Sequence, residues 1–399
     1  MTLIRKGEDW AYKEDENFPL NQSFVVSMLW KVAELTAERY VGDAENSLSI
    51  YGLDHPSNRI VVTEENQEKI ILLGAINSAT GDSYMMVEGL KKVYTVDSTF
   101  RQLFSTGITE MAIRETLPGI KLEDIQELSV SGKENITFFR EDNSEEWVIK
   151  TVDGEQQADS ELVKSLMAKF LKIRYDEMKV YSPSERELTE YGLTEPEMVL
   201  KIQYSGQKYE DRCEYTMRIG KSEPTNEGTN QNVRYVYSEK GNGIYIVKES
   251  NLVPFMQLEP EDYLSLDLAP IPKKELKSLT ILTKERRYTF EIQRSVESSK
   301  ETVYLNGSEI TETEFNRFYY PLYAFSAEKR VSDITDQLKE DPVLSMTYER
   351  TEEAGGQLVV TLIPYDQNYY GASVDGKAVL LVNRQRVNSL LYELEGIGA

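Results

Sequence analysis

The sequence predicts an α+β fold made of tandem repeats, in which each antiparallel meander is covered by one long and one short helix and the molecule is elongated. Two observations support this prediction. A six-residue phrase occurs twice, at 51–56 and 191–196, each time after an amphipathic helical pattern and before short β-type runs. The same order returns in the last third of the chain in a degenerate form. Self-similarity at a long period indicates a repeat architecture before any local pattern is considered.

The repeated phrase is interpreted as a joint between a helix and a strand. Glycine takes the positive φ that other residues avoid, and the proline that closes the phrase blocks a helix and begins an extended segment. In the third copy the phrase has decayed to Asp-Gln-Leu-Lys-Glu-Asp-Pro at 336–342. The joint residues are Tyr51, Gly52, Leu53 and Pro56 in the first copy and Tyr191, Gly192, Leu193 and Pro196 in the second.

The first copy opens with two short strands on either side of a polar turn at 6–9. Apolar residues at three- and four-residue spacing then predict a helix over 22–35, with Asn21 as its N-cap. Four β-type runs between 60 and 96 predict an antiparallel meander, and 98–111 predicts a second, shorter helix. Helical and β-type patterns follow in the same order in the later copies.

The repeats give the predicted domain boundaries, since 399 residues are too many for one ordinary core. We expect a first α+β repeat over 1–122, a second over 123–273 and a third, degenerate one over 274–399. Tyr235 of the second copy is matched to Tyr370 of the third at the same offset that joins Gly241 to Gly376.

The first copy lacks the opening strand that the others show at 128–130 and 279–281. We therefore expect about a dozen upstream residues of the repeat to be absent from this chain. A natural precursor would then be longer, with room for an export signal or a membrane anchor.

Composition excludes several function classes. With 45 Lys and Arg against 68 Asp and Glu, the net charge of −23 repels nucleic acid and anionic membrane surfaces. A single cysteine cannot form an internal disulfide, and one cysteine with one histidine is too few for a zinc site. No apolar run approaches the roughly 20 residues of a membrane span.

The residues that could carry chemistry have simpler interpretations. His55 could act as a general base, but the second joint has Glu195 at that place, so a turn residue is favoured. Cys213 lies between acidic neighbours that would raise the pKa of its thiol. The carboxylate runs at 14–16, 64–65 and 141–146 could serve glycoside hydrolysis, but such runs are usually solvated. We predict no catalytic residue, no metal ligand and no cofactor.

Tyrosine is the less ordinary feature. The chain has 25 tyrosines, with dense groups at 318–323 and 368–371. Aromatic residues at helical spacing are mostly core, yet exposed tyrosines mark surfaces that contact proteins or sugars. The candidate contact surface consists of Tyr319, Tyr320, Tyr323, Tyr369 and Tyr370.

Several of these features together resemble one bacterial family. The strand of Trp10, the Phe18-Pro19-Leu20 entry to the first helix, the Tyr-Gly-Leu-x-x-Pro joint and the strands of Gly74 and Tyr84 are similar to the domain of unknown function 4340 family. The second copy lacks the Phe-Pro pair and the third lacks the joint. The resemblance implies an N-terminal membrane anchor, a large extracytoplasmic part and an association with ABC-type transporter and gliding-motility-like components. It carries no known activity or catalytic residue.

Repeated structural units without a predicted catalytic residue indicate a non-enzymatic protein that binds or scaffolds partners at a transport system. We expect this protein to be extracytoplasmic and to be membrane-tethered in its native precursor. The expected partners are proteins of the cell envelope, such as transporter components, with no nucleic acid, and with the membrane contacted only through an anchor absent from this chain. Two alternatives stay open. One is a cell-envelope glycan hydrolase that uses a carboxylate pair, and the other is a protein that binds a small ligand or glycan in a cleft between repeats.

Overall fold

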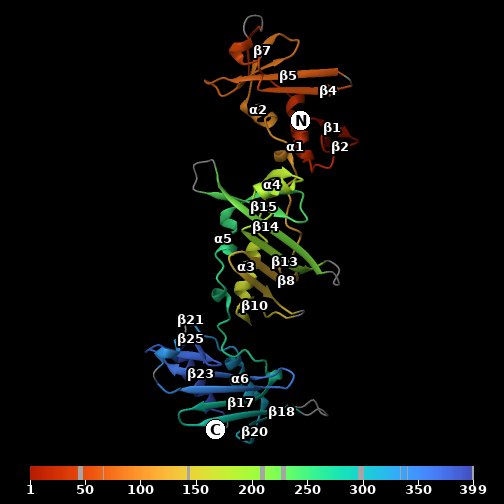
Figure 1. Cartoon of the computed structure of the whole chain (residues 1–399). Coiled ribbons are helices and arrows are strands. Elements are labelled where there is room, and N and C mark those ends of the chain that lie inside the picture. Colours follow the sequence, from red (N-terminus) through yellow and green to blue (C-terminus); the bar gives the residue numbers. More distant parts are fainter. Residues whose placement is uncertain are drawn as a thin grey trace. The chain divides into compact units, whose positions relative to one another are not determined.

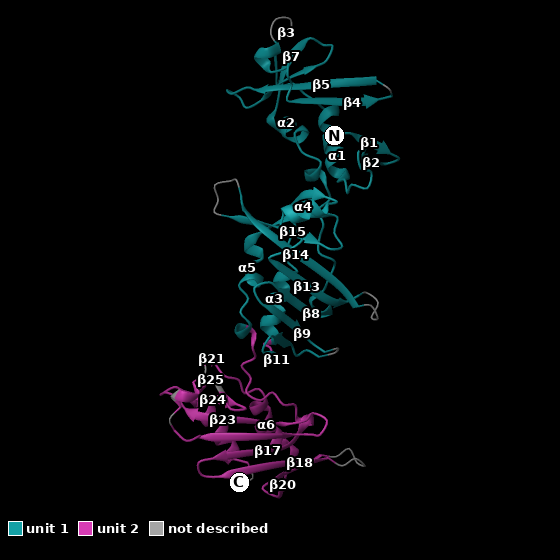
Figure 2. Ribbon diagram, in the orientation of Figure 1, with its two compact units in different colours: residues 1–156, 160–262 teal, residues 157–159, 263–399 magenta. Residues whose placement is uncertain are grey.

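The computed structural model describes residues 1–43, 48–65, 67–141, 144–206, 212–225, 231–294, 301–332, 334–338 and 340–397. The chain divides into two compact units (Figure 2). One contains residues 1–156 and 160–262, and the other contains residues 157–159 and 263–399. The predicted repeat boundaries stay a prediction. Within the described ranges no helix is long and apolar enough to cross a membrane.

The first unit begins with a hairpin and a sheet of its own (Figure 1). The hairpin pairs β1 (Leu3–Lys6) with β2 (Asp9–Tyr12), as predicted. The first sheet has the strand order β3-β7-β6-β5-β4, and all its pairs are antiparallel. Its strands are β3 (Arg39–Asp43), β4 (Asn58–Glu64), β5 (Gln67–Ile76), β6 (Ser83–Val87) and β7 (Lys92–Val96). The predicted meander is confirmed, and β3 adds an edge strand that the sequence pattern did not predict.

Two α-helices belong to the described residues of this part of the chain. α1 (Gln22–Ala33) begins after Asn21, whose side chain accepts hydrogen bonds from the next turn's amides, as predicted. α2 (Ser98–Phe104) is capped by Asp97 in the same way and ends earlier than the predicted 98–111. Phe100 of α2 is buried in the core cluster of this sheet, and the partly buried Val32 of α1 packs against that cluster.

The second sheet completes the first unit. Among the residues described it has nine strands in the order β11-β10-β9-β8-β13-β14-β15-β16-β12. They are β8 (Ile125–Ser131), β9 (Asn135–Phe139), β10 (Val148–Thr151), β11 (Gly154–Gln157), β12 (Glu177–Tyr181), β13 (Met198–Ser205), β14 (Arg212–Pro224), β15 (Asn232–Ser238) and β16 (Gly243–Lys248). The accompanying helices are α3 (Ser160–Phe170), α4 (Glu185–Glu190) and α5 (Val253–Met256). α3 buries four apolar side chains on one face, which is why its sequence is periodic.

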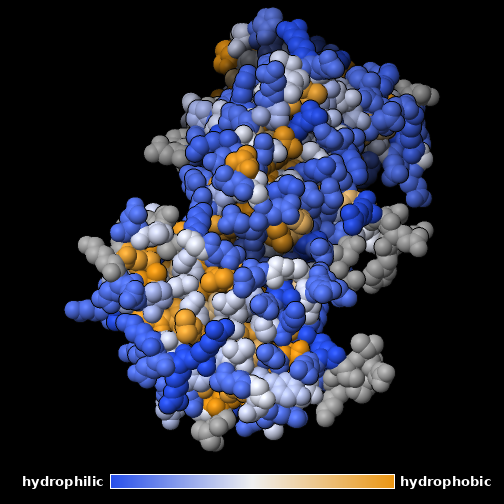
Figure 3. Space-filling model, turned by 60° about the horizontal axis from the view of Figure 1, so that its bottom comes forward, coloured by the Kyte–Doolittle hydropathy of each residue, from blue (hydrophilic) through white to orange (hydrophobic). Residues whose placement is uncertain are grey.

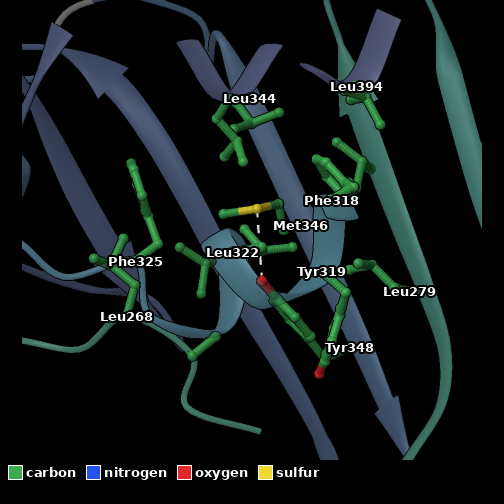
Figure 4. Packing of buried hydrophobic residues seen from close by; sticks show 14 of the residues in the cluster. Leu268, Leu279, Phe318, Tyr319, Leu322, Phe325, Leu344, Met346, Tyr348 and Leu394 are labelled. Carbon is green, nitrogen blue, oxygen red and sulfur yellow. Dashed lines mark hydrogen bonds between the residues drawn. The ribbon is translucent and has the colours of Figure 1, made fainter. Parts of the chain in front are cut away.

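The second unit contains the third sheet, in the order β20-β19-β18-β17-β22-β23-β24-β25-β21 over the described part of the chain. Its strands are β17 (Leu276–Thr283), β18 (Arg287–Arg294), β19 (Glu301–Leu305), β20 (Ser308–Ile310), β21 (Lys329–Arg330), β22 (Leu344–Arg350), β23 (Gln357–Pro364), β24 (Tyr369–Val374) and β25 (Lys377–Asn383). The helices α6 (Glu312–Tyr323) and α7 (Arg384–Glu395) place apolar side chains in one core with those of the strands. Figure 4 shows Phe318, Tyr319 and Leu322 of α6 in this core.

The three sheets follow a single design. Adding nine to each strand number of the second sheet gives the third sheet, position for position. By the same rule, the strands of the first sheet correspond to the strands of the second sheet from β12 to β13. The β1–β2 hairpin corresponds to β10 and β11. Within the described residues the first repeat therefore lacks counterparts of two strands, β8 and β9, where the sequence indicated one. The predicted cover by one long and one short helix, and the predicted elongated shape, stay predictions.

The strand register corrects one predicted match. The carbonyl oxygens of Ile246 and Leu381 each accept a hydrogen bond at 2.9 Å from the residue that precedes the edge strand, so these two residues are counterparts. Ile246 pairs with Tyr235, and Leu381 pairs with Gly371. The counterpart of Tyr235 is therefore Gly371, and the match to Tyr370 was wrong by one residue. The register shift within β24 and β25 accounts for the error, because a constant offset cannot follow a bulge.

Candidate functional site

The two intact joints share one backbone structure, the Schellman motif that ends many helices. In the second joint the amide of Leu193 donates to the carbonyl oxygen of Leu188 at 2.7 Å, and the amide of Gly192 donates to Thr189 at 3.0 Å. The first joint has the corresponding hydrogen bonds, at 2.9 and 3.1 Å. Gly52 and Gly192 have φ of 62° and 73°, which explains the glycine. Leu53 and Leu193 are buried beneath their joints.

Each joint lies against a second glycine in the sheet. The carbonyl oxygen of Tyr51 lies over Gly74 of β5, and that of Tyr191 lies over Gly220 of β14, so closely that a Cβ atom would clash in both places. Both glycines fall where the strand register shifts. The position of each joint relative to its sheet glycine is thus fixed by contact between backbone atoms.

A tyrosine pair and an arginine complete the arrangement. The ring centroids of Tyr51 and Tyr84 lie 5.0 Å apart, and those of Tyr191 and Tyr235 lie 4.4 Å apart, both pairs at 57°. An arginine donates a hydrogen bond to the carbonyl oxygen of the sheet glycine in both sheets. The arginine is Arg101 of α2 in the first sheet and Arg234 of β15 in the second. Sequence comparison missed this shared role, because the two residues come from different elements.

The third sheet has a position that corresponds to the tyrosine pair, but different residues occupy it. Gly371 replaces the tyrosine of the pair, and a Cβ atom on it would lie 2.9 Å from Leu338 and 3.1 Å from Ile334. Ile334 and Leu338 belong to a small apolar cluster at this position. Aliphatic side chains thus fill the space that two tyrosine rings occupy in the first two sheets. The third copy thus lacks both the sequence of the joint and the tyrosine packing that accompanies it.

Comparison with known proteins agrees with this repeated unit. The model of the family described as Domain of unknown function (DUF4340) matches residues 10–179 and 147–342, which together span most of the chain. The chain belongs to the DUF4340 family. The two matched stretches overlap, as expected for a tandem-repeat DUF4340 protein. No curated protein and no solved structure gave a significant match.

A polar cluster that the sequence did not indicate joins the linker of this DUF4340 chain to its second sheet. The carboxylate of Glu115 accepts a hydrogen bond from the amide of Asn242 and lies beside Tyr245. The hydroxyls of Tyr175 and Tyr215 share a hydrogen bond nearby. Burial raises the pKa of the Glu115 carboxyl, and burial raises the pKa values of the three tyrosines further from neutrality. The cluster fixes the linker to the turn before β16.

The tyrosines of the predicted contact surface do not lie together on the surface. Tyr319 is 1% exposed and donates to the carbonyl oxygen of Ile271 at 2.6 Å, and Tyr370 is buried under the guanidinium of Arg384. Neither ring is exposed, because Tyr319 lies on the buried face of α6 and Tyr370 lies on the buried face of β24. Tyr320 is 59% exposed, and Tyr323 and Tyr369 are half-buried. A contact role remains a prediction for these three.

The other candidate residues are turn or strand residues. His55 is exposed in the turn that follows the first joint. Cys213 is half-buried in β14, opposite Tyr204 of β13. Part of the acidic surroundings of Cys213, Asp211, lies outside the described residues. So do two residues of the carboxylate run at 141–146, whereas Glu64 and Glu65 are exposed.

No three metal-ligating side chains gather in the part of the chain that the structure describes. A hollow of about 360 Å³ lies at the second sheet. It is lined by Gln126, Glu127, Phe139, Arg140, Glu141, Gln203 and Arg212. The guanidinium of Arg140 already donates to the backbone carbonyls of Glu123, Ile125 and Ser144. The face shown in Figure 3 is mainly hydrophilic with separate apolar groups, which fits the acidic composition.

Proposed function

We propose that the protein is a non-enzymatic, extracytoplasmic, membrane-tethered protein that binds or scaffolds protein partners at the cell envelope, as an accessory to an ABC-type transport system. The observation that carries the proposal is the repetition of one sheet design, with the same strand order in the second and third sheets. Repeat proteins use such duplication to present binding surfaces rather than to assemble a single catalytic centre.

The charge of the chain supports a tether rather than direct adsorption to lipid. A net charge of −23 repels an anionic bilayer surface and attracts basic protein surfaces over the range of ionic screening. The protein partners are therefore expected to present positively charged contact regions. Raising the salt concentration should weaken their association.

Capture of partners in the natural host tests the proposal. The protein is expressed from its own reading frame with a C-terminal affinity tag, crosslinked lightly and purified, and the captured proteins are identified by mass spectrometry. We expect transporter or envelope-assembly subunits to be enriched over a tagged acidic control protein. Turnover of glycans or peptides by the purified protein, lost on substitution of one carboxylate, would contradict a non-enzymatic role.

Protease access tests the location. Protease added to spheroplasts should degrade the protein while a cytoplasmic marker remains intact. Protection of both until the membrane is dissolved would place the protein inside the cell and exclude the extracytoplasmic part of the proposal.

The hollow of the second sheet favours one alternative function, capture of a small polar ligand. Its lining combines two arginines, two glutamates, two glutamines and one aromatic ring, a mixture suited to a sugar or a small anion. A thermal-shift screen with charged and neutral sugars tests this alternative, because a ligand that binds the native state raises the melting temperature. Stabilisation that survives the substitution Gln203→Ala would argue against this hollow as the site.

A further inference from the structure

A small hollow lies at the second sheet beside the turn of the β8–β9 hairpin. Its volume is about 140 Å³, and it shares no lining residue with the larger hollow described above. Its walls are the hairpin turn at 132–134, the start of β13, Ile219 of β14, Arg234 of β15 and the segment from α5 to Glu259. These residues all belong to the first compact unit, and the second sheet has a counterpart of every described strand of the third. The hollow is therefore a feature of a complete sheet.

The inner part of the hollow is apolar. Side chains of the hairpin, the sheet and α5 meet there, and those of Val130, Ile136, Ile219 and Phe255 are almost fully buried. An apolar cavity of about 150 Å³ holds one benzene ring. The hollow thus has room for an apolar group of roughly six carbons.

Charged side chains surround its opening. Lys133, Glu134 and Glu259 line the hollow and are exposed. In the described part of the chain, neither Glu134 nor Glu259 has an ion-pair partner. The opening therefore carries two uncompensated carboxylates and one ammonium group.

Arg234 adds a positive charge that is already offset. Its guanidinium forms ion pairs with Glu197 and with Glu249, the latter at 2.7 Å. The charge that remains at the hollow is negative, and the chain as a whole carries −23. Such a field attracts a cation and repels an anion.

We propose that this hollow binds a primary ammonium group carried on an apolar group of about six carbons. The apolar part lies against Ile136 and Phe255, and the ammonium lies at the opening near Glu134 and Glu259. A lysine side chain does not fit this order, because its ammonium is at the tip and would enter first. A free amphipathic amine and the N-terminal residue of a peptide with an apolar side chain share the required chemistry. The proposal does not depend on the proposed function.

Methionine methyl groups report on the site directly, because Met198 and Met256 line the hollow. Full-length protein with ¹³C-labelled methionine methyl groups is titrated with hexylamine near neutral pH, where the amine is protonated. We expect saturable shifts of the signals of Met198 and Met256, which are assigned with Met198→Leu and Met256→Leu. The signals of Met85 and Met86 in the first sheet should not move.

A ligand series tests the chemistry. From butylamine to hexylamine the affinity should rise about fourfold for each added methylene group, because each one is buried. Hexanol should bind more weakly than hexylamine, and hexanoate should bind most weakly. The peptide Phe-Gly-Gly-amide and its N-acetylated form distinguish the two sources. Binding of the free peptide that is lost on acetylation indicates a peptide N-terminus, whereas binding of hexylamine alone indicates a free amine.

Carboxylate variants localise the charge. Glu134→Gln combined with Glu259→Gln should weaken hexylamine binding by about threefold to tenfold and leave hexanol binding unchanged, because only the ammonium loses its partners. Glu261→Gln is the matched control, since Glu261 is exposed nearby but does not line the hollow. It should leave both ligands unaffected. The methionine spectrum without ligand checks that the variants are folded.

Three results would overturn the proposal. They are an absence of saturable shifts at Met198 and Met256, equal affinity for hexylamine and hexanoate, and hexylamine binding that is unchanged by the double substitution. Shifts spread over most methionines would also overturn it, because they would mean binding without a defined site. None of these results affects the partner-capture experiment of the proposed function.

Discussion

The carbonyl oxygen of Tyr191 lies directly over Gly220, so that any side chain at position 220 would collide with the backbone of the joint. The same oxygen accepts a hydrogen bond from the amide of the next residue, Lys221, at 3.1 Å. The helix end and the sheet are therefore held together by backbone atoms. This contact explains why the Tyr-Gly-Leu phrase and a glycine in the sheet occur together in the first two repeats.

Substitution of Gly220 by alanine should destabilise the second sheet. The added methyl group forces the joint away from β14, at a cost of about 1–3 kcal/mol. Urea unfolding followed by tryptophan fluorescence measures the change; of the three tryptophans, Trp147 is 1% exposed and lies beside this sheet. Gly119→Ala is the control, because a Cβ atom there meets nothing within 4 Å and its backbone is unstrained. Equal stability of the two variants would refute the contact as a constraint.

Removal of the Arg234 side chain should be costly. Its guanidinium pairs with Glu197 and with Glu249, the latter at 2.7 Å, and donates to Gly220, while its side chain is 9% exposed. We expect Arg234→Met to lose about 3 kcal/mol of unfolding free energy, since a partly buried charge loses its partner. Arg218→Met, which breaks the surface pair with Glu239, should cost less than about 1 kcal/mol. The two urea midpoints are compared directly.

The cost of Arg234→Met should also depend on pH. Burial alone would raise the pKa of Glu249, but the hydrogen bond from Arg234 and its other polar contacts hold that pKa below its usual range. A lowered folded-state pKa gives stability that is present above the ordinary glutamate range and is lost as the pH falls through the folded-state pKa. The difference between wild type and variant should therefore shrink in acid. A difference that stays constant to pH 3 would contradict this account.

Glu115 should give the opposite pH dependence. Burial raises the pKa of its carboxyl, so the folded state binds the proton more tightly than the unfolded chain. The resulting stabilisation is present below the ordinary glutamate range and is lost as the pH rises through the raised pKa. Glu115→Gln cannot ionise, so its melting temperature relative to wild type should increase between about pH 4 and pH 7. Glu123→Gln, at an exposed position of the same linker, should show no such trend.

Two adjacent tyrosines of α6 should behave differently. Tyr319→Phe removes the hydrogen bond to the buried carbonyl of Ile271 and should cost about 1–3 kcal/mol. Tyr320→Phe, at an exposed position, should change stability by less than about 0.5 kcal/mol. Thermal unfolding of the full chain measures both. Similar losses would mean that the hydroxyl of Tyr319 contributes nothing to the core.

Local features were readable from the sequence. The turn of the hairpin that opens the chain, the N-cap of α1 and the alternation of apolar residues in the meander depend on residues that are near neighbours along the chain. The repeat was visible in the sequence because the joint keeps the same residues in two copies. They are kept because the glycine takes a positive φ and the leucine is buried. Long-range features were not readable. Glu115 and Asn242 are separated by 127 positions, and no pattern in the linker marks the glutamate as a contact of the second sheet.

The sequence by itself therefore indicated the opening hairpin, the capped first helix, the meander and the repetition of the unit, because hydrophobic period, caps and glycine conformation act locally. Only the tertiary structure decided the strand order and the burial of Tyr319 but not Tyr320. It also showed the bulge that makes Gly371, rather than Tyr370, the counterpart of Tyr235. It also revealed that the first repeat has no counterparts of β8 and β9 among the described residues, which leaves β4 as an edge. The physical reason is that pairing and burial depend on which surfaces meet in space, and residues on different strands supply those surfaces.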